Sequence, residues 1–291
     1  MQRSFFNGHP MRPILITGGN GQIACALAQH KLPTSKLILL PRETLDITNY
    51  AAVSDAINTY APRWIINTAA YTAVDRAEDE PELANLINHQ GAANIAEIAR
   101  TGNIPLLHLS TDYVFDGDQR NPYSEDDPVN PRNQYGKSKW LGEIAVRKYC
   151  PQHIILRISG VFSEHGNNFF KTMLKLKTNN QPISVVADQI TCPTYANDIA
   201  NVIFNIIQQC SEKKSVPWGT YHYCNTPIVS WHQFAMAILQ CEISPITTAE
   251  TNRKASRPVN ACLDCSKILT NFGIQQADWR EAIAVLLSGQ S

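Results

Sequence analysis

A tyrosine and a lysine four positions apart, in the segment Tyr135-Gly-Lys-Ser-Lys139, are the residues of this chain best suited to chemistry. On a helix, side chains at positions i and i+4 lie on the same face. The Lys139 ammonium would then lie beside the Tyr135 phenol and would lower the pKa of that phenol toward working pH. A hydroxyl at the end of a preceding strand, Thr111 or Ser110, could hold a carbonyl oxygen next to the phenol. This set could pass a proton to or from a C–O group while something else moves the hydride.

A glycine-rich segment near the N-terminus gives that spacing its context. The apolar run Ile14–Thr17 leads into Gly18-Gly-Asn-Gly-Gln-Ile-Ala24 and then into a stretch that can form a helix. Glycines let the backbone approach a pyrophosphate closely, and a following helix N-terminus offers free N–H groups and a positive dipole end. The spacing is one residue wider at its start than the usual dinucleotide fingerprint. It indicates a dinucleotide site, and a turn that binds nothing is the alternative.

Size and composition exclude several classes of protein. A chain of 291 residues suggests one large domain or two small ones. The net charge is zero, which argues against nucleic acid or an anionic membrane as a partner, and no apolar run reaches membrane-spanning length. Residues 1–11 have no apolar signal core and are expected to form a flexible extension, so we expect a cytoplasmic protein.

The cysteines and histidines give no sign of a metal site. The eight cysteines are scattered, which is unlike a disulfide scaffold. Cys262 and Cys265 form a Cys-x-x-Cys pair, but a zinc ribbon needs a second pair of ligands. The eight histidines show no ligand spacing. We therefore expect no metal and a reducing compartment.

Alternation of short apolar runs with amphipathic stretches predicts an α/β fold. Strands are expected at Ile14–Thr17, Lys36–Leu40, Trp64–Asn67, Leu106–Ser110 and Ile154–Ile158. Helices are expected at Gln22–His30, Asn49–Tyr60, Pro81–Arg100 and Arg132–Tyr149. This order is typical of a Rossmann-type, doubly wound parallel sheet. Ligands of such sheets bind beyond the carboxyl ends of the strands, so Gly18, Ala69, Thr111 and Gly160 are expected at one edge.

After Ile158 the pattern loosens and predicts a second, smaller unit. The elements expected there are helix Asn168–Lys177, strand Ile183–Ala187, helix Asp198–Gln209, strand Thr220–Cys224, and helices near Trp231–Cys241, Ser266–Phe272 and Trp279–Leu287. Residues 12–158 would form the dinucleotide-binding domain. Residues 159–291 would mainly form a smaller, interleaved C-terminal substrate-binding lobe, with a segment at about 196–210 returning to the first domain.

Four motifs together resemble the extended short-chain dehydrogenases. They are the glycine segment, Asn67-Thr-Ala-Ala-Tyr-Thr-Ala-Val-Asp75, Ser110-Thr-Asp-Tyr-Val-Phe-Asp-Gly117 and Tyr135-Gly-Lys-Ser-Lys139. Within that group the chain is similar to the dTDP-4-dehydrorhamnose reductase family, over about Pro13 to Leu287. The resemblance implies NADPH-dependent reduction of the C4 keto group of a dTDP-4-keto-6-deoxyhexose, first of all dTDP-4-dehydro-L-rhamnose, for surface polysaccharide synthesis. It also leaves a homodimer open.

The resemblance implies a role for each matching position. Tyr135 would be the general acid, Thr111 the catalytic hydroxyl, and Lys139 the holder of the nicotinamide ribose. Further cofactor-binding residues would be Gly18, Asn20, Gly21, Gln22, Ile23, Asp46, Ile47, Ala69, Ala70 and Tyr71. The substrate-binding residues would be Val74, Asp75, Ser110, Gly160, Asn168, Gln189 and Arg257. Arg42, just past the second strand, could meet the 2′-phosphate of NADPH, with NADH tolerated, while Glu43 is expected to point elsewhere.

The chain departs from the family pattern at Gly160 and Thr191, and the change at Gly160 bears on the substrate. Gly160 stands where rhamnose-forming members commonly have a tryptophan, and Thr191 stands where a glycine is common. A lost indole would leave room for a different sugar, so a dTDP-sugar synthase of the dihydrostreptose type is one alternative. The second is a non-catalytic nucleotide-binding subunit, like the beta subunit of methionine adenosyltransferase, because a binder can keep the fold. Two of these residues also have a purely structural interpretation. Asp75 could stabilise a helix N-terminus through the helix dipole, and Arg257 could be an ordinary surface residue.

Overall fold

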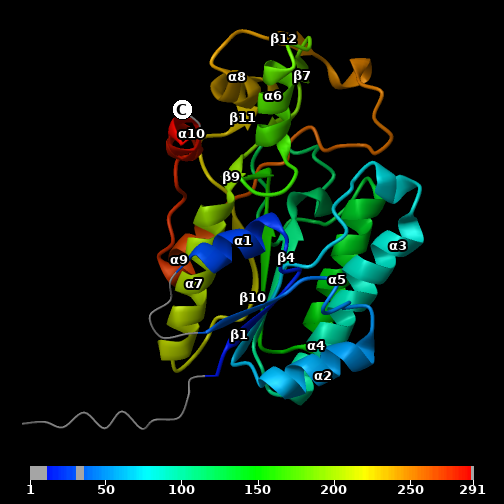
Figure 1. The fold of residues 1–291 in the computed structure, drawn as a ribbon, viewed down its shortest axis with the longest axis vertical. Coiled ribbons are helices and arrows are strands. Elements are labelled where there is room, and N and C mark those ends of the chain that lie inside the picture. Colours follow the sequence, from blue (N-terminus) through cyan, green and yellow to red (C-terminus); the bar gives the residue numbers. More distant parts are fainter. Residues whose placement is uncertain (1–11, 31–35, 290–291) are drawn as a thin grey trace, which may run out of the picture.

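A six-stranded parallel sheet forms the centre of the molecule (Figure 1), in a computed structural model that describes residues 12–30 and 36–289. Its strands lie in the order β10-β5-β4-β3-β1-β2, and all five pairings are parallel. The strands are β1 (Ile14–Thr17), β2 (Leu37–Leu40), β3 (Trp64–Asn67), β4 (Leu106–Thr111), β5 (His153–Ile158) and β10 (Gly219–Tyr223). The predicted doubly wound α/β fold is confirmed. The extension expected at residues 1–11 lies outside the described residues.

Alternate residues of each strand face opposite helical layers. In β1, Ile14 and Ile16 pack in a core with helices on one face of the sheet, whereas Leu15 packs in a second core with helices on the other face. Figure 1 shows the same two layers. The helices of these layers are α1 (Gln22–Gln29), α7 (Ala196–Glu212) and α9 (Ser266–Phe272) on one face, and α2 (Tyr50–Tyr60), α4 (Ala92–Thr101) and α5 (Gln134–Tyr149) on the other. Burial on both faces explains why most strand residues are apolar on both sides of the sheet.

The helix expected at Pro81–Arg100 is interrupted. It consists of α3 (Pro81–Asn85), a π-helical turn η2 (Leu86–Gly91) and α4. The π turn carries the buried Asn88, whose side chain binds the backbone N–H and C=O of Tyr71 at 2.8 and 3.0 Å and the Ser138 hydroxyl at 2.9 Å. The interruption therefore ties the loop after β3 to helix α5, which carries Tyr135. Such turns are common at functional sites.

Several small elements at one end of the sheet form a lobe of their own (the top of Figure 1). Its strands pair as β6 (Val161–Phe162) with β9 (Thr194–Tyr195), β7 (Ser184–Val186) with β12 (Ser244–Ile246), and β8 (Ile190–Thr191) with β11 (Val229–Ser230). Its helices are α6 (Phe169–Thr178), α8 (Trp231–Leu239) and α10 (Trp279–Ser288). A separate aromatic core around Phe162, Phe170, Phe234 and Trp279 holds this lobe together. No helix in the described ranges is long and apolar enough to cross a membrane.

The strand expected at Thr220–Cys224 is not part of this lobe, contrary to the sequence-based assignment. It is β10, an edge strand of the main sheet, and it pairs with β5 from Gly219 to Tyr223. Helix α7, which precedes it, lies against α1 on the same side of that sheet. The chain thus leaves the main sheet after β5 and re-enters it along α7 and β10.

Candidate active site

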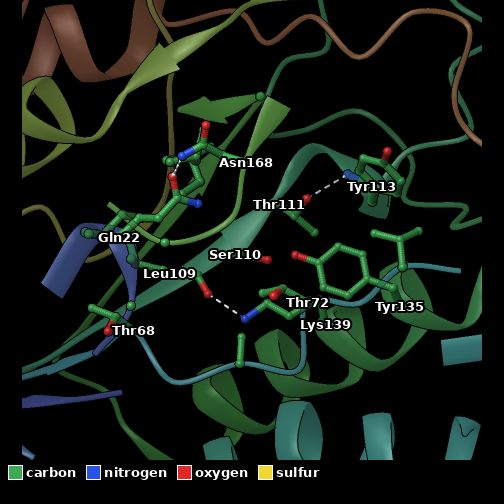
Figure 2. A pocket seen from close by; sticks show the side chains of 18 of the residues that line it. Gln22, Thr68, Thr72, Leu109, Ser110, Thr111, Tyr113, Tyr135, Lys139 and Asn168 are labelled. Atoms are coloured by element: carbon green, nitrogen blue, oxygen red, sulfur yellow. Dashed lines mark hydrogen bonds between the residues drawn. The ribbon is translucent and has the colours of Figure 1, made fainter. Parts of the chain in front are cut away.

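A cavity of about 680 Å³ opens at the carboxyl ends of the parallel strands, between the main sheet and the small lobe (Figure 2). Most of the residues expected at the site line it: Gly18, Asn20, Gly21, Gln22, Ile23, Arg42, Ala69, Ala70, Val74, Ser110, Thr111, Tyr135, Lys139, Gly160, Asn168, Gln189 and Arg257. Its size lies in the range of cofactor and ligand pockets. The edge of the sheet on which the sequence placed the chemistry is thus the edge that carries the cavity.

Four residues expected at the site do not line the cavity. The Asp46 carboxylate accepts hydrogen bonds from the Thr48 backbone and hydroxyl at 2.9 and 2.8 Å, so it closes a local turn. Ile47 is buried in the core, against Gly91. The Tyr71 hydroxyl donates to Glu80 at 2.6 Å. The Asp75 carboxylate accepts hydrogen bonds from the Arg257 guanidinium and does not itself line the cavity. These positions are close in sequence to residues of the cavity, but their side chains bind or pack against other parts of the protein.

The glycine turn fits a pyrophosphate. Gly18 has φ +70°, and a Cβ there would lie 2.7 Å from the Cα and N atoms of Ala69, so only glycine allows β1 and β3 to end this close together. Gly21 precedes α1 without a side-chain cap, and no acidic residue lies in the first turn of the helix. The first N–H groups of α1 therefore face the cavity without a competing side-chain acceptor.

The far end of the cavity carries Arg42, Glu43 and Asn20. Arg42 is exposed at the mouth, directly after β2. Glu43 also lines the cavity, and its carboxylate accepts a long hydrogen bond of 3.5 Å from the Asn20 side chain. The expectation that Glu43 points elsewhere is therefore wrong. This end presents one cation and one anion to any group that reaches it.

Lys139 is buried on the inner face of helix α5. Asn133 caps this helix by accepting from the Gly136 N–H at 2.7 Å, so the helix begins just before Tyr135. The Lys139 side chain is 2% exposed, and its Nζ donates to the Leu109 carbonyl at 2.7 Å (Figure 2). Burial lowers the pKa of Lys139 to about 8, against an opposing attraction from Glu143. A single turn of helix separates this ammonium from the Tyr135 phenol.

The Tyr135 phenol points toward the Ser110 and Thr111 hydroxyls (Figure 2). Burial raises the pKa of Tyr135, the Thr111 hydroxyl lowers it less, and Asp112 raises it further. The expectation that Lys139 lowers this pKa is wrong for this structure, because burial outweighs the other effects. The phenol keeps its proton at neutral pH and can therefore act as a general acid.

Glu143 lies behind Ser110 and was missed at the sequence level. The Ser110 hydroxyl donates to the Glu143 carboxylate at 2.5 Å. That carboxylate is fully buried, and it also accepts from Arg157 at 2.9 and 2.8 Å and from Arg147 at 2.6 Å. Its position four residues after Lys139 continues the Tyr135–Lys139 helix face, which is the signal that could have found it.

The small lobe closes the other side of the cavity. The Asn168 side chain donates to the Gln22 side chain at 2.8 Å, which joins the lobe to the first turn of α1. Phe169 and Trp231 line the cavity with ring centroids 4.7 Å apart, and neither was expected there. Gln189 also lines it, although its side chain donates to the Thr248 hydroxyl at 3.0 Å. Two aromatic rings therefore form part of the wall that the small lobe contributes.

Arg257 reaches the cavity from the C-terminal part of the chain. Its guanidinium forms a two-pronged ion pair with Asp75, at 3.0 and 2.8 Å. Asp75 also accepts from the Ala255 N–H at 3.1 Å. The ion pair joins segments that are 182 positions apart, so Arg257 is held in place and is not a free surface residue. No cluster of ligands that could hold a metal ion occurs within residues 12–30 and 36–289.

Comparison with known proteins places the chain in a family. The model of the RmlD substrate binding domain matches residues 11–290. The dTDP-4-dehydrorhamnose reductase of Aggregatibacter actinomycetemcomitans is 43% identical over 94% of this chain and 97% of its own length. The chain belongs to the dTDP-4-dehydrorhamnose reductase family. The similarity inferred from the four motifs is thereby confirmed.

Solved structures of the family share the fold. The dTDP-4-dehydrorhamnose reductase of Bacillus anthracis, solved in complex with NADP, superposes with a TM-score of 0.90 at 35% identity, covering 96% of this chain and 99% of that one. The enzyme of Clostridium acetobutylicum gives a TM-score of 0.89 at 36% identity, covering 95% and 99%. The described part of the chain therefore follows the architecture of the family, including the small lobe.

The two departures from the family pattern lie side by side. Gly160 has φ +53°, and a Cβ at this position would lie 3.0 Å from the Thr191 hydroxyl. A larger residue at position 160 would therefore need both a strained backbone and a shift of Thr191. The residue at position 191 therefore limits what position 160 can hold.

Proposed function

We propose that this protein is an NADPH-dependent reductase that converts dTDP-4-dehydro-L-rhamnose to dTDP-L-rhamnose. The main observation behind this proposal is that Tyr135, Thr111 and Lys139 line one cavity (Figure 2). The same cavity contains the glycine turn suited to a pyrophosphate. Membership of the reductase family and the NADP bound to the Bacillus anthracis relative support the same cofactor here. A cytoplasmic location and a supply of product for surface polysaccharide follow as part of this proposal.

The side chains divide the work of the reduction. Bound NADPH would supply the hydride that reaches C4 of the sugar. Tyr135 would give its proton to the carbonyl oxygen, so that ketone, hydride and proton together yield the alcohol. Lys139 would hold the nicotinamide ribose and, as a cation, stabilise the charge that develops on the phenol. The glycine turn and the start of α1 would bind the pyrophosphate.

The small lobe would bind the nucleotide sugar. We propose that residues 12–158 mainly bind the cofactor and that the lobe built on residues 159–291 binds substrate, apart from the α7–β10 segment that joins the main sheet. Trp231 and Phe169 offer flat apolar surfaces suited to a base or sugar ring. Arg257 offers a guanidinium to the diphosphate, held in orientation by Asp75.

The test is turnover with an identified product. The protein is incubated with NADPH and dTDP-4-dehydro-L-rhamnose, loss of NADPH is followed by absorbance, and the nucleotide sugar is identified by NMR. We expect steady NADPH consumption and dTDP-L-rhamnose as product. A ring-contracted sugar would instead support the dihydrostreptose-type alternative. Tight NADPH binding without consumption would support a regulatory subunit. The named relatives favour neither alternative.

A further inference from the structure

The carboxyl group of Asp112 lies directly behind the catalytic hydroxyl and has no role in the reaction described above. Asp112 lies at the floor of the cavity and is 3% exposed. The Thr111 hydroxyl donates to one of its oxygens, Oδ1, at 2.8 Å. The Ser159 hydroxyl donates to the other, Oδ2, at 2.8 Å. Asp112 therefore touches the group that should bind the reacting oxygen, but not that oxygen itself.

Counting protons on Thr111 exposes a conflict. A hydroxyl has one proton to donate, and Thr111 gives it to Asp112 while accepting from the Tyr113 N–H at 3.2 Å. Toward the cavity, the Thr111 oxygen then offers only a lone pair. A substrate carbonyl oxygen is also an acceptor, so the two oxygens could not form a hydrogen bond. With Asp112 ionised, Thr111 cannot do what the reaction asks of it.

Protonation of Asp112 removes the conflict. A neutral carboxyl with its proton on Oδ1 donates to Thr111, and the Thr111 proton becomes free to turn toward the cavity. The Ser159 hydroxyl is compatible with both the ionised and the neutral carboxyl of Asp112. It can donate to Asp112 or, instead, to the Ala261 carbonyl at 3.2 Å or the Thr191 hydroxyl at 3.3 Å. The pair of Asp112 and Thr111 thus has two fully hydrogen-bonded arrangements that differ by one proton.

The surroundings favour the neutral form more than water would. The titratable groups that face Asp112 are Tyr135 on α5, Tyr113 on η3 (Asp112–Val114), and the thiols of Cys192 and Cys262 from the C-terminal half. None of these four is a cation that would hold a carboxylate ionised. Burial raises the pKa of Asp112 to about 6, against the two hydroxyl donors that lower it.

We propose that Asp112 is a positioning residue that sets the direction of the Thr111 hydroxyl, and that its neutral carboxyl is the form in which Thr111 donates to the substrate carbonyl. This inference rests on the proposed reductase function. Because substrate then binds the neutral form better, binding must raise the pKa of Asp112 by linkage. The pH dependence of kcat/KM reports the free enzyme and that of kcat reports the complex. The limb due to Asp112 therefore lies at higher pH in kcat than in kcat/KM.

The first experiment compares pH profiles of four proteins. In the wild type, we expect kcat/KM to fall as pH rises through about 6. The decrease should be roughly fivefold to tenfold, because one hydrogen bond to the substrate oxygen is lost. Asp112→Asn carries an amide that donates to Thr111 at every pH, so this limb disappears. Thr111→Val also lacks the limb and is slow throughout. Asp55→Asn, an exposed exchange of the same chemistry on α2, keeps it. Two results for Asp112→Asn would overturn the proposal. One is a decrease in kcat/KM near pH 6 that persists in this variant, and the other is a loss of its activity by the same factor at every pH.

The second experiment needs no turnover. The side-chain carboxyl of Asp112 is titrated by carbon NMR in the wild type and in Thr111→Val, with Asp112→Asn assigning the signal. Removing the Thr111 donor destabilises the carboxylate, so the pKa of Asp112 rises further in Thr111→Val. An unchanged pKa would refute the hydrogen-bond direction. If the protein bound the sugar but never reduced it, the reductase function would fail while this titration still decided the arrangement of Thr111 and Asp112.

Discussion

At the reacting end of the cavity, the hydroxyls differ in what holds their protons. The Ser110 hydroxyl donates to Glu143 and the Thr111 hydroxyl donates to Asp112, both buried carboxyl groups. The Tyr135 phenol instead faces Thr111, and burial keeps its pKa above the usual value. The Ser110 and Thr111 protons are thus held by carboxyl groups, whereas Tyr135 stays protonated until a substrate oxygen accepts its proton, so among these three groups we assign the general acid to Tyr135.

Removing that phenol should stop the chemistry and spare the cofactor. In Tyr135→Phe, we expect kcat to fall by at least about 10²-fold, because general acid catalysis is typically worth about 10²–10⁴. The affinity for NADPH, measured by fluorescence titration, should change little, since the glycine turn is untouched. Tyr149→Phe, at the far end of the same helix, is the matched control. Near-normal turnover in Tyr135→Phe would remove Tyr135 from the acid role.

The charge of Lys139 should set an upper pH limit for activity. Burial lowers the pKa of Lys139 to about 8, so the ammonium is present below that pH and is lost as pH rises through it. We expect kcat of the wild type to fall above about pH 8. In Lys139→Met, kcat and NADPH affinity should both be low and this limb should be absent, while Lys137→Met, an exposed exchange on the same helix, should retain it. Normal NADPH binding by Lys139→Met would contradict its role at the ribose.

The far end of the cavity should distinguish the two nicotinamide cofactors. Arg42→Ala should weaken NADPH more than NADH, by about 1.5–3 kcal/mol, the worth of a charge-assisted hydrogen bond to a phosphate. Glu43→Gln, at the neighbouring position on the same cavity wall, should instead favour NADPH, because it removes a negative charge. Dissociation constants for both cofactors test this. Equal losses for NADPH and NADH in Arg42→Ala would show that Arg42 does not read the 2′-phosphate.

The residues that sequence reasoning found are those with local spacing. Tyr135 and Lys139 share a helix face, and Gly18 and Gly21 share a turn, so their neighbours in sequence disclose them. Asp112 escaped because its partner Ser159 follows β5. Glu143 shares the helix face of Tyr135 and Lys139, but its buried partner Arg157 lies in β5, so spacing alone does not show that its carboxylate reaches Ser110. The expected direction of the Tyr135 pKa shift was wrong for a similar reason. The shift is dominated by burial, which depends on how the whole cavity floor packs.

At the scale of elements, hydrophobic periodicity was sufficient for the long segments. The first five strands and the helices between them occur where apolar runs and amphipathic stretches predict them, with end shifts of one or two residues. The π turn at Leu86–Gly91 was not predicted, because a segment of six residues is too short to show the shift in apolar period that one extra residue causes. The two-residue strands of the small lobe are too short to show any period at all.

The turn between β1 and α1 should tolerate no side chain at Gly18. Gly273→Ala, also at positive φ but with no atom within 4 Å of its Cβ, should cost only backbone strain, about 1–2 kcal/mol of unfolding free energy. Gly18→Ala should cost that strain and about 1–3 kcal/mol more, because its Cβ would meet Ala69 at 2.7 Å. Denaturant unfolding measures both. Only Gly18→Ala should also weaken NADPH, and equal effects of the two variants would refute the close approach to Ala69.

At the scale of the whole molecule, the two regions are joined by long-range contacts that no local pattern encodes. The placement of β10 in the main sheet depends on its pairing with β5, more than sixty positions earlier. The Gln22–Asn168 and Asp75–Arg257 contacts span 146 and 182 positions. Each fastens the C-terminal half of the chain to the rim of the cavity, so the cavity exists only when both regions are folded together.

The Asp75–Arg257 ion pair should make part of the stability depend on pH. The hydrogen bond from Arg257 holds the pKa of Asp75 below its usual value of 3.8. The side chain of Asp75 is 45% exposed, so solvent screening limits the contribution to about 0.2–1 kcal/mol. Because the folded pKa is depressed, this contribution is complete above about pH 4 and is lost as pH falls through the folded pKa.

A variant that cannot titrate isolates this contribution. Asp75→Asn should lower the unfolding free energy at pH 7, and its difference from the wild type should shrink as pH falls below about 4, because protonation gives the wild type the same neutral side chain. Asp79→Asn breaks an ion pair with Lys254 that joins the same two segments but is exposed on both sides, so it should change stability less. Urea unfolding at a series of pH values measures all three proteins. A difference between Asp75→Asn and wild type that stayed constant down to pH 2 would show that Asp75 contributes through packing rather than through its charge. Closure of the cavity rim would then depend on shape and not on this ion pair.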